Sequence, residues 1–200
     1  MDINLAGFLP ALLPIALSPG ASFTLAMNSA LTAGRKGLFK TLLGTALGIY
    51  THALLIGLGL STALVASPAL FGLLKMAGVL YLLWLGGLLF ITGVRTKTFA
   101  LNATESAVTI KGAWLANVAN PKAILFYLTV VSQFVGNRAG IDAFLTLATV
   151  HIAVMVIWLA LFSQALVFSA QKLNPVSLKR YVNMGGGLLL MVIAVRSLTG

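Results

Sequence analysis

Six long apolar stretches, separated by short polar gaps, account for nearly the whole chain. A helix that crosses the hydrocarbon core of a bilayer needs about 20 mostly apolar residues, and the stretches are close to that length or longer. No gap is long enough for a soluble domain. The pattern therefore predicts an all-α integral membrane protein with six transmembrane helices in a single transmembrane domain, 1–200. The predicted spans are 5–31, 42–65, 69–93, 113–134, 143–168 and 181–198.

Two of the predicted spans contain a proline motif. Ser-Pro-Gly at 18–20 interrupts the first span, and Asn-Pro-Lys at 120–122 interrupts the fourth. Proline removes one backbone N–H and displaces the carbonyl one turn earlier, and unpaired backbone groups are costly in lipid. The motifs therefore predict kinked or broken first and fourth helices that line a polar site. The alternative is that they only bend the helices, which many membrane helices tolerate.

Several features recur at similar offsets in the two halves of the chain. Pro19 and Pro121 are 102 residues apart, and His52 and His151, in the second and fifth spans, are 99 apart. Three spans in each half would make the second half an inverted copy of the first. We expect a 3+3 inverted repeat: about 1–95, a cytoplasmic linker at about 94–112, and about 113–200. Apolar helices rich in glycine and leucine also match by chance, so each feature alone is weak.

Composition supports a membrane protein. Hydrophobic residues make up 60% of the 200 and charged residues 8%, with a mean hydropathy of +1.04. The formal charge of +10 does not predict nucleic-acid binding, because the cations lie in gaps between apolar stretches and form no basic stripe. Cysteine is absent, which excludes disulfides and thiolate metal sites. Asp2 is the only early charge, so we expect a retained first span rather than a signal peptide.

The basic residues predict an orientation. Nine lie in the first, third and fifth gaps, against two in the fourth gap and at the C-terminus, Arg138 and Arg196. Basic residues concentrate on the cytoplasmic side, so both termini are expected on the outer, periplasmic side of the bacterial inner membrane. Lys75 and Lys122 lie within spans. The nine are Arg35, Lys36, Lys40, Arg95, Lys97, Lys111, Lys172, Lys179 and Arg180.

The two breaks define a candidate binding site. The N-terminal end of a half-helix favours anions and the C-terminal carbonyls favour cations, so two inverted breaks offer both polarities in one cavity. That arrangement suits a zwitterion such as an amino acid. The candidate substrate-binding residues are Ser18, Pro19, Gly20, Ser22, Asn28, Asn117, Asn120, Pro121 and Lys122.

Most of the basic groups inside spans have both a functional and a structural interpretation. An ammonium within a span suggests a functional site, so Lys122 either binds a substrate carboxylate or caps the break itself. Lys75 is nearer the outer end of its span and is expected to extend its ammonium to the interface. His52 and His151 either relay protons or form hydrogen bonds between helices.

Other chemistries find little support in the sequence. The three acidic residues, Asp2, Glu105 and Asp142, lie near ends or in gaps, so no metal site is expected within the membrane. No nucleophile motif or phosphate-binding loop is present, so we expect neither an enzyme nor a cofactor.

Five motifs are similar to those of the lysine exporter superfamily (LysE/RhtB) of bacterial amino-acid exporters. They are Ser-Pro-Gly at 18–20, Gly-x-x-Gly at 34–37, Gly-x-x-x-Gly at 44–48, Gly-x-x-Tyr-Leu-x-x-Leu-Gly at 78–86 and Asn-Pro-Lys-Ala at 120–123. The resemblance covers nearly the whole chain and implies proton-driven efflux of amino acids or related metabolites. Ala21 stands where the family often has a second proline, which implies a gentler first break.

The leading hypothesis is a secondary transporter that exports small neutral amino acids, with protons as coupling ion. A cationic side chain would find no buried acid, which argues against basic substrates. The alternatives are a cation or heavy-metal exporter and a non-transporting membrane scaffold. A homo-oligomer is compatible with the sequence, which does not determine the oligomeric state.

Overall fold

The computed structural model describes residues 3–66, 68–97, 108–135, 140–168 and 175–199. Helices form nearly all of this part of the chain, which contains no β-strand beyond an isolated bridge between Ile3 and Val135. The elements are α1 (Leu5–Leu17), α2 (Ala21–Ala66), α3 (Pro68–Arg95), α4 (Ile110–Val118), α5 (Pro121–Leu125), the π-helix η1 (Phe126–Val130), the 3₁₀ turn η2 (Val131–Phe134), α6 (Ile141–Phe168) and α7 (Pro175–Thr199).

Four helices in the described part are long and apolar enough to cross a membrane, by length and composition. They are α2, α3, α6 and α7, whose outward faces carry large apolar side chains such as Leu55, Leu73 and Leu161. So much exposed apolar surface is expected only in lipid. The predicted first and fourth spans are not among the four, because in both the helix is interrupted. Six spans and the inverted repeat therefore stay predictions.

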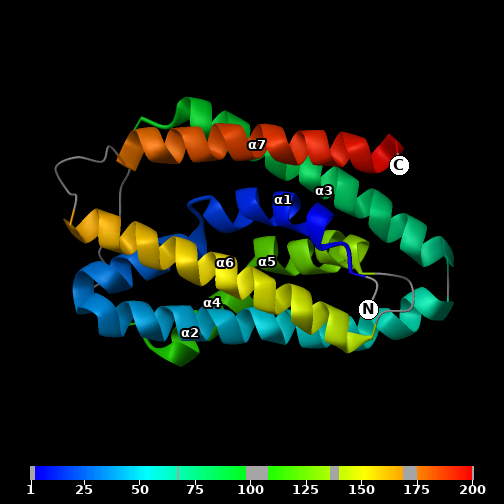
Figure 1. Ribbon diagram of the computed structural model, residues 1–200, viewed down its shortest axis with the longest axis horizontal. Helices are drawn as coiled ribbons and strands as arrows, with labels where there is room; N and C mark the ends of the chain where they lie inside the picture. The colour runs from blue at the N-terminus through cyan, green and yellow to red at the C-terminus, as the bar shows by residue number, and fades with distance from the viewer. Residues whose placement is uncertain (1–2, 67, 98–107, 136–139, 169–174, 200) are drawn as a thin grey trace.

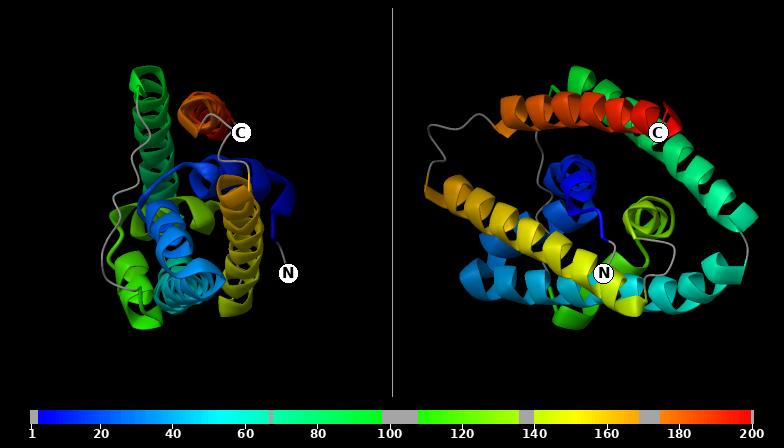
Figure 2. Two further views of the ribbon diagram at one scale, coloured as in Figure 1. Left: turned by 90° about the vertical axis from the view of Figure 1, so that its left-hand side faces the viewer. Right: turned by 45° about the vertical axis from the view of Figure 1, so that its right-hand side comes forward.

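The helices lie in three layers (Figure 1). Helices α3 and α7 form one outer layer, α2 and α4 form the other, and α1 and α5 lie between them, with α6 along one side (Figures 1 and 2). The largest interface between two helices joins α3 to α7, whereas α2 and α3 contact each other little. The end of α1 and the start of α5, where the two interruptions lie, are thus held in the middle of the molecule.

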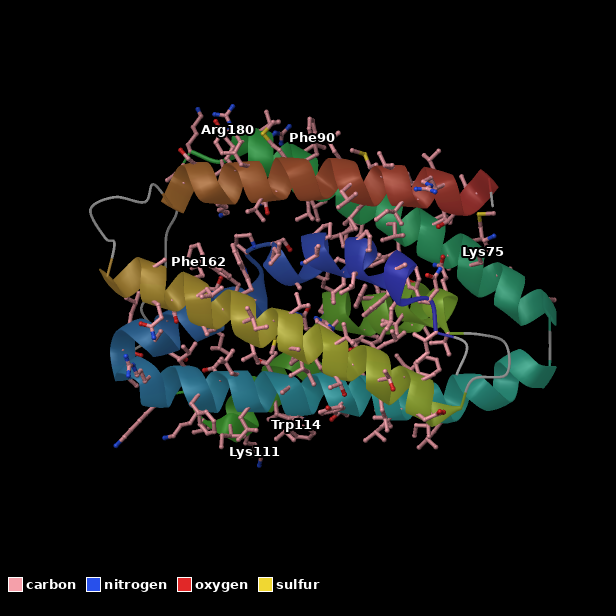
Figure 3. The ribbon with its side chains drawn as sticks, in the orientation of Figure 1. Lys75, Phe90, Lys111, Trp114, Phe162 and Arg180 are labelled. Atoms are coloured by element: carbon pink, nitrogen blue, oxygen red, sulfur yellow. The ribbon has the colours of Figure 1, made fainter. Side chains whose placement is uncertain are left out.

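Glycines allow the two helices within each outer layer to pack closely. A Cβ at Gly86 of α3 would lie 2.8 Å from the carbonyl oxygen of Gly187 in α7. Gly48 of α2 lies directly against Asn117 of α4, and Trp114 Nε1 of α4 donates to Thr51 Oγ1 of α2 at 3.0 Å (Figure 3). Small residues at such contacts let helices approach where lipid provides no hydrophobic driving force.

The first predicted gap differs from a loop. Helix α2 runs through it and departs from helical geometry only at Gly34, whose φ of 58° and ψ of −147° are accessible essentially to glycine. A single residue therefore reverses the chain within the gap predicted between the first two spans. Helix α4 also begins earlier than residue 113, because the Thr109 hydroxyl caps it by accepting from the Gly112 N–H at 3.0 Å.

Some predictions fall outside the described residues. They concern Asp2, Glu105, Arg138 and Lys172, and most of the linker at 94–112.

Candidate functional site

The first interruption leaves the Ile15 carbonyl without its helical partner. Helix α1 ends at Leu17, Ser18 is extended, and α2 begins at Ala21. In a continuous helix the Ile15 carbonyl would accept from the N–H of residue 19, but Pro19 has none. Ser18 Oγ donates to the Ile15 oxygen at 3.1 Å instead.

The second interruption repeats this arrangement. Helix α4 ends at Val118 and α5 begins at Pro121, with Asn120 as N-cap, whose Oδ1 accepts from the Lys122 N–H at 3.0 Å. The Asn117 carbonyl is four residues before Pro121 and also lacks its helical donor. It accepts from His52 Nε2 at 3.2 Å and from the Asn120 N–H at 3.0 Å. Because a carbonyl only accepts, His52 carries its proton on Nε2.

Lys122 connects the two interruptions. Its ammonium donates to the Ile15 carbonyl at 3.1 Å and to Ser18 Oγ at 2.5 Å, across 107 and 104 residues of sequence. A cation at the C-terminal end of α1 pairs with the partial negative charge of the last carbonyls. The structure therefore places Lys122 as a cap on the first break, one of its two predicted roles.

A cavity of about 70 Å³ lies between the interruptions. Water occupies at least about 10–15 Å³ in this measure, so the cavity has room for about five water-sized groups. Its polar lining comes from both breaks and from the helices beside them. These residues are Ser18, Gly20, Ser22, Thr45, Asn117, Asn120, Lys122 and His151.

The remaining wall is apolar, and aromatic rings close it on two sides. Phe23 packs edge-to-face on Phe162 of α6, with ring centroids 4.9 Å apart (Figure 3 labels Phe162). Phe126 stacks on the fully buried Phe8 at 6.3 Å. The apolar lining residues are Ile15, Ala16, Ala21, Phe23, Ile49, Ala123, Phe126, Met155 and Leu159.

Most of the predicted site residues meet at this cavity, and some do not. Pro19 and Pro121 shape the breaks but are not among the lining residues. Asn28 is buried in α2 and does not line the cavity. None of the described lining residues is acidic, so the Lys122 ammonium has no carboxylate there. Within the described part of the chain, no three His, Cys, Asp or Glu side chains form a group that could hold a metal ion.

The two histidines lie on either side of one tyrosine. The Tyr127 ring stacks on His52 and on His151, each with centroids 5.9 Å apart. The Tyr127 hydroxyl lies 3.2 Å from His151 Nδ1, and all three side chains are buried. His151 lines the cavity and His52 does not. The proton relay stays a prediction, whereas hydrogen bonding of His52 between helices is observed.

Sequence reasoning did not identify three residues of this region as functional. Thr45 lines the cavity, Tyr127 links the histidines, and the Tyr81 hydroxyl of α3 donates to the Lys122 carbonyl at 3.0 Å. Tyr81 belongs to the motif at 78–86, which was a signal of its importance but not of its partner.

Curated proteins similar to this chain include efflux proteins. The homoserine/homoserine lactone efflux protein of Salmonella typhimurium (strain LT2) is 29% identical over 184 residues, which cover 90% of this chain and 89% of that protein. The leucine efflux protein of Enterobacter sp. (strain 638) is 30% identical over 181 residues, covering 88% and 84%. An uncharacterized membrane protein of Vibrio cholerae is 28% identical over 68% of this chain and 67% of its own length.

No solved structure matches the chain. The family described as LysE type translocator matches residues 13–200, which is nearly the full length. This match confirms the resemblance inferred from the proline and glycine motifs. The chain belongs to the LysE family of translocators.

Proposed function

We propose that this protein is a secondary transporter that exports small neutral amino acids across the bacterial inner membrane, coupled to the proton gradient. Its family and the efflux activities named for its relatives support an amino-acid exporter. The observation that carries the finer proposal is the cavity, in which a lysine ammonium without an acidic partner faces hydroxyl and carboxamide groups.

The lining divides into regions that match the parts of an amino acid. The substrate carboxylate pairs with the Lys122 ammonium and with the N-terminal end of α2, whose partial positive charge favours anions. The ammonium pairs with Ser22 Oγ and the Asn117 carboxamide, whose oxygen has no partner within the described structure. The side chain lies against Phe23, Met155 and neighbouring apolar residues, and the cavity volume favours a short one.

A comparison in proteoliposomes tests this function. Labelled leucine, homoserine, lysine and arginine would be followed with and without an imposed pH gradient. We expect the neutral substrates to move faster with the gradient and the basic ones to move little. Faster flux of arginine or lysine would contradict the proposed substrate class, and flux indifferent to the gradient would contradict proton coupling.

A matched pair of lysine variants tests the cavity itself. Lys122→Met removes the ammonium from the cavity, and we expect flux to fall at least about tenfold, since charge-assisted hydrogen bonds contribute about 1.5–3 kcal/mol. Lys75→Met removes a lysine that lies on α3, away from the cavity (Figure 3), and is expected to leave flux unchanged. Equal flux in the two variants would show that the cavity is not the binding site.

A further inference from the structure

Helix α3 meets the second interrupted segment at two residues one turn apart. Gly78 lies against η1, where a Cβ would come within 2.5 Å of the Thr129 carbonyl oxygen. Tyr81, which is only 6% exposed, donates its hydroxyl to the Lys122 carbonyl at 3.0 Å. The glycine permits the close approach, and the tyrosine fixes where along α5 the contact forms.

The Tyr81 bond is not needed to satisfy the backbone of α5. The Lys122 carbonyl also accepts from the N–H of Phe126, which begins the π-helical turn. A carbonyl oxygen has two lone pairs, so removal of the Tyr81 hydroxyl leaves no unpaired acceptor. The bond therefore acts on the position of Lys122 more than on the stability of the helix.

Lys122 is also the residue that reaches the first break. Its backbone is held by α3, and its ammonium is held by Ile15 and Ser18 of the α1 break. Helix α3 packs mainly on α7 and little on α2, and it reaches the cavity region through its contact with η1 and the hydrogen bond from Tyr81 to Lys122 of α5. One residue thus joins the α3–α7 pair to both interruptions.

We propose that Tyr81 is a positioning residue, which holds Lys122 over the α1 break and ties the α3–α7 pair to the substrate cavity. This role rests on the proposed function, because it assigns a mechanical partner to the residue that binds the substrate carboxylate. The substrate is an amino acid, and the relevant moiety is its carboxylate. Loss of the hydrogen bond from Tyr81 lets Lys122 move, while the residues that line the cavity stay the same.

The test compares Tyr81→Phe with a control that removes an equivalent hydroxyl. Tyr181 of α7 is 71% exposed, so Tyr181→Phe leaves the cavity region unchanged. In proteoliposomes, Tyr81→Phe is expected to raise the KM for a neutral amino acid about fivefold, as loss of one hydrogen bond suggests, with little change in the maximal rate. Tyr181→Phe is expected to match the wild type in both constants.

Hydrogen exchange provides a readout that needs no transport. In purified full-length protein, Tyr81→Phe and Lys122→Met should each speed amide exchange in the segment 14–24, and the double variant should exchange no faster than Lys122→Met alone. Faster exchange confined to α3, or additive effects in the double variant, would overturn the positioning role. If the wild type moves no amino acid, the proposed function fails, and the exchange data still decide whether Tyr81 acts through Lys122.

Discussion

At the scale of single residues, the two proline-freed carbonyls are capped in the same way. Ile15 and Asn117 each lie four residues before a proline, and each accepts from a basic side chain of a distant helix, Lys122 and His52 respectively. The Lys122 ammonium has three N–H donors and uses two of them on the Ile15 carbonyl and Ser18 Oγ, so the proposed bond to a substrate carboxylate does not require the cap to break.

His52 is predicted to act as a cap through Nε2. His52→Leu leaves the Asn117 carbonyl with one donor fewer in a buried site, and we expect the free energy of unfolding to fall by about 1–3 kcal/mol. His52→Gln keeps an N–H donor of similar reach and should recover most of that loss. Melting temperatures of the detergent-solubilised variants provide the measurement. If His52→Gln has the same melting temperature as His52→Leu, the hydrogen bond to the Asn117 carbonyl is not the stabilising feature.

The same pair separates the cap from the predicted proton relay. Glutamine donates a hydrogen bond but does not titrate, so a cap alone predicts that His52→Gln retains gradient-driven flux. A relay through His52, Tyr127 and His151 predicts that flux loses its dependence on the pH gradient. His151 differs from His52 in facing the cavity, so the two histidines need not share a role.

The sequence predicts the effects of a residue on its neighbours in the chain, but not its contacts with residues far away in the sequence. Proline acts on its own neighbours, so the sequence could indicate where the backbone leaves the helix and which residues surround the break. It could not choose between cap and substrate ligand for Lys122, because the Ile15 carbonyl is 107 residues away. Tyr81 and His52 were likewise visible as residues, whereas their partners Lys122 and Asn117 depend on how the helices pack.

At the scale of helices, close glycine contacts hold the α3–α7 pair together. Gly86 faces the backbone of Gly187, and Gly187 faces the backbone N–H of Phe90, so neither position has room for a side chain (Figure 3 labels Phe90). Backbone cannot move aside as a flexible side chain can, and overpacking typically costs about 1–3 kcal/mol. The motif at 78–86 includes Gly86, but nothing in the sequence indicated that Gly86 would contact Gly187.

The neighbouring glycines of α3 provide a matched test of this contact. Gly86→Ala is expected to lower the melting temperature, because the new methyl group would meet the Gly187 carbonyl oxygen at 2.8 Å. Gly87→Ala places its methyl group in open space and should be neutral or stabilising, because alanine favours helix over glycine by about 1 kcal/mol. Thermal unfolding of both variants gives the comparison, and equal destabilisation would contradict the packing described for the two helices.

At the scale of the whole molecule, the layers explain why the cavity lies where it does. Helices α1 and α5, which meet the two breaks, form the middle layer of the described structure, and the outer layers touch each other little (Figure 2). Polar backbone at membrane depth is tolerated where it lines a cavity enclosed by protein. The outer layers provide that enclosure, so the breaks avoid lipid while the long helices face it.

The positions of the termini and of the basic helix ends predict how the molecule is oriented in the membrane. The two termini lie toward the same end of the long axis, and α3 ends and α7 begins toward the opposite end (Figure 1). Arg95 and Arg180 belong to those helix ends, and the excess of basic residues predicts that this end faces the cytoplasm. Ala33 and Ala69 are exposed alanines near opposite ends, and the chain has no native cysteine to react in the background.

Single cysteines at these alanines therefore report the orientation directly. In spheroplasts treated with a membrane-impermeant maleimide, Ala69→Cys is expected to react at once, and Ala33→Cys only after the membrane is permeabilised. Both changes replace an exposed alanine, so differences in reactivity reflect the side of the membrane rather than burial. The reverse pattern would place the basic end outside, which would contradict the positive-inside assignment and turn the proposed export pathway round.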